Sequence, residues 1–272
     1  MFPSVYNVHT QRKSLAHVFA GIGLLLIAAN ARGSSKPSDA ELAAITKHGI
    51  VLAEYDKAAW QATDAVQAVH PAEGRVGRYI GRKTEAGWVV DFGRLNDAGD
   101  KFLVAYEAVQ TGNATRFAVK GFDPVREDAG WNLAAAKGIE TALGDFGGSS
   151  RPYNIAVLPA ESEGMYVYLY PAQVKAGVYP LGADVRYHLS RNGIKIGEKR
   201  RMHNSIIESV PARADTKLVS GYHTHVLSDV PEDTDVLLVL TRQPRVSEIV
   251  VARTYVYTIG VDGKIAVANR PR

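Results

Sequence analysis

Apolar residues recur at helical spacing in the segment that begins at Ser38. The sequence Ser38-Asp39-Ala40-Glu41 fits a capping box, in which Ser38 is the N-cap and Glu41 reaches back from the third helical position. Pro71 ends the pattern. The spacing predicts one long helix over residues 39–69, whose apolar face is formed by Leu42, Ile45, Leu52, Tyr55, Ala59 and Val66.

Four short runs of strand-forming residues follow this helix, with turn residues between them. Their spacing predicts an antiparallel meander of strands at Arg75–Gly81, Trp88–Arg94, Phe102–Gln110 and Arg116–Gly121. A second helix is predicted to open at Asp123-Pro124, because proline is favoured at the first helical position. Its apolar stripe is Trp131, Ala135, Ile139, Ala142 and Phe146. The tryptophans Trp60, Trp88 and Trp131 are expected in the core.

The second half of the chain is mostly strand-forming, and Asn192-Gly193 marks a tight hairpin. One short helix is predicted at Pro231–Thr241. Strands are predicted at Tyr153–Pro159, Met165–Tyr170, Asp184–Ser190, Ile194–Arg200, Lys217–Val226, Glu248–Ile259 and Lys264–Ala268. The fold class is therefore α+β, with antiparallel sheet dominating, a long N-terminal helix and two shorter helices. The glycine- and serine-rich stretch 144–152 predicts a boundary between regions 32–147 and 148–272.

The first 31 residues have the pattern of an export signal. Arg12 and Lys13 precede the apolar run Leu15–Ala28, and Ala29-Asn30-Ala31 supplies the small-x-small site of signal peptidase. We expect cleavage after Ala31 and a periplasmic or secreted protein. An uncleaved membrane anchor is the alternative, although the run is shorter than the ~20 residues that span a bilayer. No later segment is long and apolar enough to span a membrane.

Composition and charge remove several classes of function. The chain has no cysteine, which excludes disulfides, thiol nucleophiles and cysteine metal sites. The net charge of +4 includes Arg12 and Lys13, so the mature chain carries only +2 and has no field to attract nucleic acid. Dinucleotide-binding, P-loop, H-E-x-x-H and G-x-S-x-G motifs are absent from the sequence. The partners left are a protein or a cell-envelope component.

His223-Thr224-His225 is the strongest candidate for chemistry. Residues i and i+2 of a strand project from one face, so both imidazoles can reach one ion. Asp235, near the start of the predicted helix at Pro231–Thr241, can return a carboxylate to them. Two imidazoles and a carboxylate leave a fourth position for water, as catalytic zinc requires. Zinc is the one cofactor that the sequence suggests.

This arrangement resembles the JAMM metalloprotease family over part of the C-terminal third of the chain. In that family a strand with His-x-His precedes a helix start with Ser-x-x-Asp, and an upstream glutamate acts as general base. His223, His225 and Asp235 match if the loop is one residue shorter, whereas Glu232 replaces the serine and Val226 a proline. Glu208 is the candidate for the base. The resemblance implies a zinc-dependent hydrolase; the rest of the chain looks like an exported bacterial protein.

A simpler interpretation stands beside it. Asp229 and Glu232 form a capping pair for the helix, and the two histidines are ordinary strand residues. The protein is then a non-catalytic exported protein that binds a partner or an envelope component. Tyr166, Tyr168 and Tyr170 alternate along one strand and are the candidate ligand-binding residues. The sequence leaves open whether the protein is an enzyme.

The export signal leads to a direct prediction. N-terminal sequencing of the mature protein should begin at Arg32, because signal peptidase cleaves after a small-x-small site. Recovery of Met1 in a membrane-bound mature form would identify residues 15–31 as an anchor.

Overall fold

The computed structural model describes residues 36–112, 115–209 and 216–271. The predicted export signal at residues 1–31 lies outside the described residues. Within them, no helix has the length and apolar character needed to cross a membrane.

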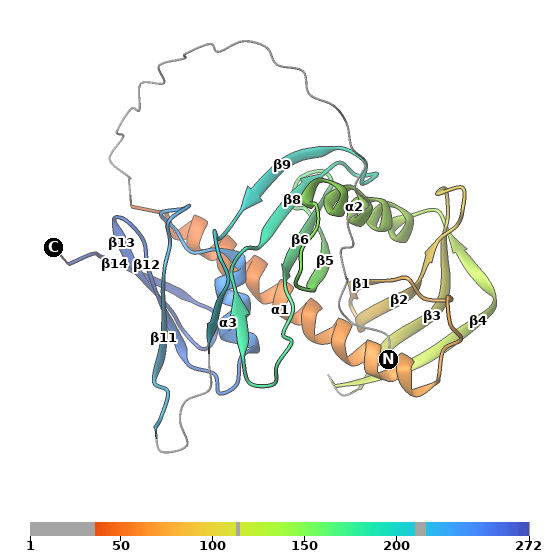
Figure 1. Ribbon diagram of the computed structural model, residues 1–272, viewed down its shortest axis with the longest axis horizontal. Coiled ribbons are helices and arrows are strands. Elements are labelled where there is room, and N and C mark those ends of the chain that lie inside the picture. Colours follow the sequence, from red (N-terminus) through yellow and green to blue (C-terminus); the bar gives the residue numbers. More distant parts are fainter. Residues whose placement is uncertain (1–35, 113–114, 210–215, 272) are drawn as a thin grey trace, which may run out of the picture.

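The described residues form an α+β fold, as predicted (Figure 1). Its helices are α1 (Asp39–Ala68), α2 (Trp131–Phe146) and α3 (Asp233–Thr241). The N-terminal meander contains β1 (Arg78–Thr84), β2 (Gly87–Leu95), β3 (Phe102–Thr111) and β4 (Arg116–Asp128). The central sheet contains β5 (Tyr153–Pro159), β6 (Met165–Pro171), β8 (Val185–Leu189) and β9 (Ile196–Arg201). A two-stranded sheet pairs β7 (Tyr179–Leu181) with β10 (Ile207–Ser209). The C-terminal sheet contains β11 (Ser220–Thr224), β12 (Ser247–Val251), β13 (Tyr255–Ile259) and β14 (Ile265–Asn269).

Helix α1 runs across the molecule and packs on several groups of elements (Figure 1). The hydroxyl of Ser38 accepts the Glu41 N–H at 3.1 Å, which confirms the predicted N-cap. Along the helix, Leu42 packs in the core beside α3 and the C-terminal sheet, Leu52 packs against the central sheet, and Val66 packs against the N-terminal meander. This one helix therefore joins the separate parts of the core.

Strands β1 to β4 form the predicted antiparallel meander. The prediction that a helix opens at Asp123-Pro124 is wrong, because β4 continues through Pro124 to Asp128 and α2 begins only at Trp131. The continuation pairs with β3 after a register shift between Val104 and Tyr106. Such an irregularity interrupts the hydrogen bonding between the strands where proline has no N–H to donate.

The central sheet has the order β5-β6-β8-β9 and is covered on both faces. Alternate residues of β6 point to opposite sides. Val167 packs with Ile139, which is buried in the middle of the predicted stripe of α2, while Tyr168 packs with Leu52 of α1 and Leu237 of α3. The sheet therefore places β6 directly against the helix that carries Asp235.

The C-terminal sheet has the order β11-β12-β13-β14. Strands β11 and β12 are parallel, and α3 is the crossover between them. The single strand predicted at Glu248–Ile259 is instead two antiparallel strands, β12 and β13, that turn around Ala252. The predicted division into regions 32–147 and 148–272 stays a prediction. Ile80 of β1 and Val167 of β6 belong to one buried cluster.

The expectation that all three tryptophans lie in the core is wrong for Trp60. Trp88 is 5% exposed and meets the Tyr55 ring edge-on at 5.6 Å, and Trp131 is partly buried against the central core. Trp60 is 61% exposed. It follows the buried Ala59 by one residue, which rotates its side chain by about 100° away from the face that packs.

The difference in burial between Trp88 and Trp60 predicts unequal losses of stability when each is replaced by alanine. Trp88→Ala should lower the free energy of unfolding by roughly 3–5 kcal/mol, because it opens a cavity beside Tyr55. Trp60→Ala should change it by less than about 0.5 kcal/mol, as expected for a surface position. Urea denaturation of both variants measures the difference, and equal losses would contradict the packing described.

Candidate metal centre

Strand β11 and the residue that follows it present two histidines on one side. His223 lies opposite Val250 in the parallel ladder, and the His225 N–H continues the ladder by donating to the Val251 carbonyl at 2.9 Å. The backbone is therefore extended through both residues, and their side chains project from the same face. Their Nε2 atoms lie 3.2 Å apart.

Asp235 reaches these histidines from the first turn of α3. Its Oδ2 accepts the Glu232 N–H at 2.7 Å in a capping box, which fixes the carboxylate. Its Oδ1 lies 3.0 Å from Nε2 of His223, and Oδ2 lies 3.1 Å from Nε2 of His225. The three residues proposed from the sequence as metal ligands therefore lie together.

A third histidine, His203, completes the group from the segment that follows β9. Its Nε2 lies 2.9 Å from Nε2 of His225 and 3.0 Å from Oδ1 of Asp235. The segment passes so close to Gly182 that a Cβ there would lie 2.1 Å from the Ser205 carbonyl oxygen. We call the group formed by His203, His223, His225 and Asp235 the histidine–aspartate cluster; all four residues are buried.

Each imidazole of the cluster is held through its other nitrogen. Nδ1 of His203 lies 2.8 Å from Asp184 Oδ1, and Nδ1 of His223 lies 2.8 Å from Glu248 Oε1. Nδ1 of His225 lies 2.9 Å from the carbonyl oxygen of Val230. Carboxylates and carbonyls accept hydrogen bonds, so each Nδ1 donates. In the neutral imidazoles, all three Nε2 lone pairs therefore point at one another and at Asp235.

The spacing of these donor atoms fits a small tetrahedral ion. Donors at about 2.0–2.1 Å from zinc in a tetrahedron lie about 3.3 Å from one another. The ligand atoms of the cluster all lie within 4.8 Å of one another, and the close pairs are 2.9 to 3.2 Å apart. A buried group of three histidines and one aspartate could hold a metal ion.

The electrostatics of the cluster call for positive charge at its centre. Burial opposes the charged form of His203, but the carboxylates of Asp235 and Asp184 raise its pKa to about 11. Burial opposes it in His223 too, but hydrogen bonds to Asp235 and Glu248 raise the pKa to about 9. Burial would raise the pKa of Asp235, yet the neighbouring histidines hold it well below its usual range. Protons or a cation must therefore balance the carboxylates.

The other acids at the start of α3 have partners of their own. Glu232 is 3% exposed and accepts two hydrogen bonds from the Arg200 guanidinium, at 2.8 and 2.9 Å. Burial raises the pKa of Glu232, against the effect of Arg200. Asp233 accepts hydrogen bonds from Arg186 at 2.6 Å and from Tyr168 at 2.8 Å. These contacts dock the helix start on the central sheet and position Asp235.

The tyrosines proposed as ligand-binding residues face α1 and α3. Tyr168 and Tyr170 are buried, and their hydroxyls donate to Asp233 and to Asp56, the latter at 2.7 Å. Tyr166 is partly buried and packs against the ring of His188 at a centroid distance of 5.2 Å. Two of the three phenols are therefore engaged inside the protein.

Sequence reasoning missed His203, Asp184 and Glu248. His203 lies 22 residues before His225, and no motif spacing links them. Glu208, the residue proposed as general base, lies on β10 and pairs with Arg151 at 2.6 Å. The pattern of two histidines and an aspartate is thus present in a looser form than in the JAMM family, and no family membership follows from it.

Comparison with known proteins adds no further assignment: no family model, no curated protein and no solved structure matches this chain.

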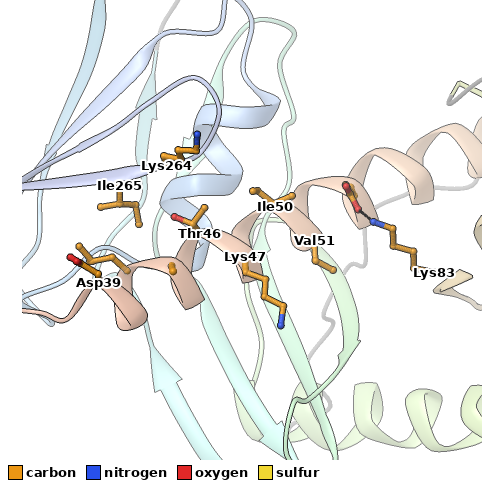
Figure 2. Close-up of a pocket in the computed structure, with 11 residues that line it drawn as sticks. Asp39, Thr46, Lys47, Ile50, Val51, Lys83, Lys264 and Ile265 are labelled. Carbon is orange, nitrogen blue, oxygen red and sulfur yellow. Dashed lines mark hydrogen bonds and ion pairs between the residues drawn. The ribbon is translucent and has the colours of Figure 1, made fainter. Parts of the chain in front are cut away.

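The described residues also line an open groove of about 590 Å³ along the first half of α1 (Figure 2). Leu42, Ile50 and Val51 line it with Ile265 of β14, and the ammonium of Lys83 lies at its edge. None of its lining residues belongs to the histidine–aspartate cluster. The cluster is therefore a buried centre, separate from this groove.

Gly221 allows the contacts behind His223 and provides a test. A Cβ at Gly221 would lie 1.8 Å from Glu248 Oε2 and 2.4 Å from Arg242 Nη1, so Gly221→Ala should cost about 1–3 kcal/mol of stability. Gly77→Ala is the control, because its Cβ would lie 3.5 Å from the nearest atom, Arg94 Cβ. Thermal unfolding measures the stability of both variants. An unchanged melting temperature in Gly221→Ala would show that the side chains of Glu248 and Arg242 can move aside.

Proposed function

We propose that the protein is an exported metalloprotein that holds one divalent cation, preferentially zinc, in the histidine–aspartate cluster. The observation that carries this proposal is the convergence of three Nε2 lone pairs and one carboxylate, with every Nδ1 donating elsewhere. Nitrogen-rich sites with one oxygen suit zinc and its neighbours in the first transition row. Hydrogen bonds from Nδ1 to a carboxylate or carbonyl are typical of histidines that bind metals.

The ligand set favours a structural ion over a catalytic one. Catalytic zinc has three protein ligands and keeps one position for water, whereas structural zinc has four protein ligands. His203 supplies the fourth donor, at the position that the hydrolase hypothesis reserves for water. The carboxylates nearest the cluster, Asp184 and Glu248, hold histidines, and Glu232 is paired with Arg200. None of the three is poised as a general base.

The same proposal includes a non-catalytic role outside the cytoplasm, periplasmic or secreted. Its support is the signal pattern at residues 12–31 and the absence from the sequence of the common catalytic motifs. A near-neutral mature chain suits a protein or envelope component as partner better than nucleic acid. The ion would then stabilise the binding protein and would not act on a substrate.

Metal content and melting temperature test the site. Protein purified without chelators should contain one zinc ion per chain by elemental analysis. Added zinc should raise the melting temperature of the metal-free protein, because an ion at 100 times its Kd stabilises the native state by about 2.7 kcal/mol. His225→Ala should abolish this rise. His188→Ala is the matched control, since its imidazole contacts the Glu163 carbonyl outside the cluster.

His203→Ala separates a structural site from a hydrolase. A four-ligand structural site should lose most of its zinc with His203, as it does with His225. A three-ligand catalytic site should retain zinc in His203→Ala, with water in the vacated position. If His203→Ala retains zinc and the protein has peptidase activity, the structural role is wrong and the hydrolase alternative takes its place.

A further inference from the structure

We propose that Glu248 and Arg242 form a positioning pair behind His223, and that this pair sets the affinity of the cluster for its divalent cation. The inference rests on the proposed metal site and concerns residues that donate no atom to the ion.

Glu248 connects the cluster to Arg242 through its two carboxylate oxygens. It lies on β12, beside β11, and is 3% exposed. Its Oε1 accepts from Nδ1 of His223 at 2.8 Å, and its Oε2 accepts from Nη1 of Arg242 at 2.6 Å. The carboxylate therefore cannot turn without breaking a charge-assisted hydrogen bond in a dry environment.

Arg242 is fixed just as firmly at the C-terminal cap of α3. It is 3% exposed, and its Nη2 donates to the carbonyls of Val246 at 2.7 Å and Ser247 at 2.8 Å. Arginine remains charged under all ordinary conditions, so Oε2 of Glu248 faces a permanent positive charge. Helix α3 thus contributes to the centre at both ends: Asp235 at its start and Arg242 at its end.

His223 differs from the other two histidines of the cluster in the group that accepts its Nδ1 hydrogen bond. A carboxylate that accepts from Nδ1 fixes the tautomer and makes Nε2 a stronger donor to a metal. His203 has Asp184 in this role, but Oδ2 of Asp184 accepts no hydrogen bond from the part of the chain that is described. His225 has a neutral carbonyl. Only Glu248, among these three partners, is held by a buried cation.

The charges of these groups favour a divalent ion. With neutral imidazoles, the carboxylates of Asp235, Asp184 and Glu248 carry three negative charges, and Arg242 carries one positive charge. Two negative charges are left, and a dication balances them. Arg200 and Arg186 do not alter this balance, because each is paired with an acid of its own, Glu232 and Asp233. Removal of charge from Glu248 would leave the loaded centre with an uncompensated positive charge.

Zinc affinity of Glu248→Gln, measured on the full chain by competition with a chromophoric chelator, tests the inference. We expect a 10- to 100-fold loss of affinity, with the Co²⁺ absorption spectrum still that of a four-coordinate ion. Asp91→Asn is the matched control: it neutralises another buried acid, on β2 and paired with Arg126 at 2.8 Å, that contacts no residue of the cluster. It should change the affinity less than threefold, even if it lowers the melting temperature.

A second pair of variants covers the case in which Glu248→Gln does not fold. Arg242→Met should lower zinc affinity about tenfold, and Arg242→Lys, which keeps the charge, should recover part of it. Wild-type affinity in Glu248→Gln, or equal losses in Glu248→Gln and Asp91→Asn, would overturn the positioning role while the metal site stands. A wild-type protein that binds no zinc would overturn both proposals.

Discussion

The start of α3 is a buried acidic turn, and its charges constrain the structure around it. Buried carboxylates are tolerated only when each has a partner. Glu232 and Asp233 have Arg200 and Arg186, which are direct neighbours across β8 and β9. Asp235 instead faces three imidazoles. The central sheet must therefore present two arginines at one end of one short helix. The segment after β9, strand β11 and the residue that follows β11 must present three histidines there.

Helix α1 provides the frame for this arrangement. It packs against α3 and the C-terminal sheet near its start, against the central sheet in the middle, and against the meander near its end. Gly49 lies directly against α3, where a Cβ would lie 2.4 Å from Val236 Cβ. Only glycine, which has no Cβ, allows the two helices to lie so near to each other at this point. The contact involves Val236, the residue after Asp235, and therefore fixes the position of Asp235 relative to the histidines.

Local patterns sufficed for most of the elements. The N-cap at Ser38, the helical repeat of α1, the meander and the hairpin at Asn192-Gly193 all rest on neighbours within a few residues. The errors have non-local causes. Pro124 reads as a helix start in isolation, but pairing with β3 keeps it in a strand. His223 and His225 are visible as a pair, whereas His203, Asp184 and Glu248 join them only through tertiary packing. A single sequence contains no spacing that would reveal them.

The origin of the four donors has a consequence for when an ion can enter. They come from the segment after β9, from β11 and its end, and from α3, so no short stretch of the chain contains the whole set. The unfolded chain offers at most the local pair His223 and His225, which is a weak chelator beside the assembled centre. If the centre binds the proposed ion, its capture is tied to the last docking of these elements, and the metal would be drawn from the compartment in which the chain folds. For an exported chain that folds after translocation, the supply would be extracellular or periplasmic, and the occupancy of the centre would follow the metal content of that surrounding space.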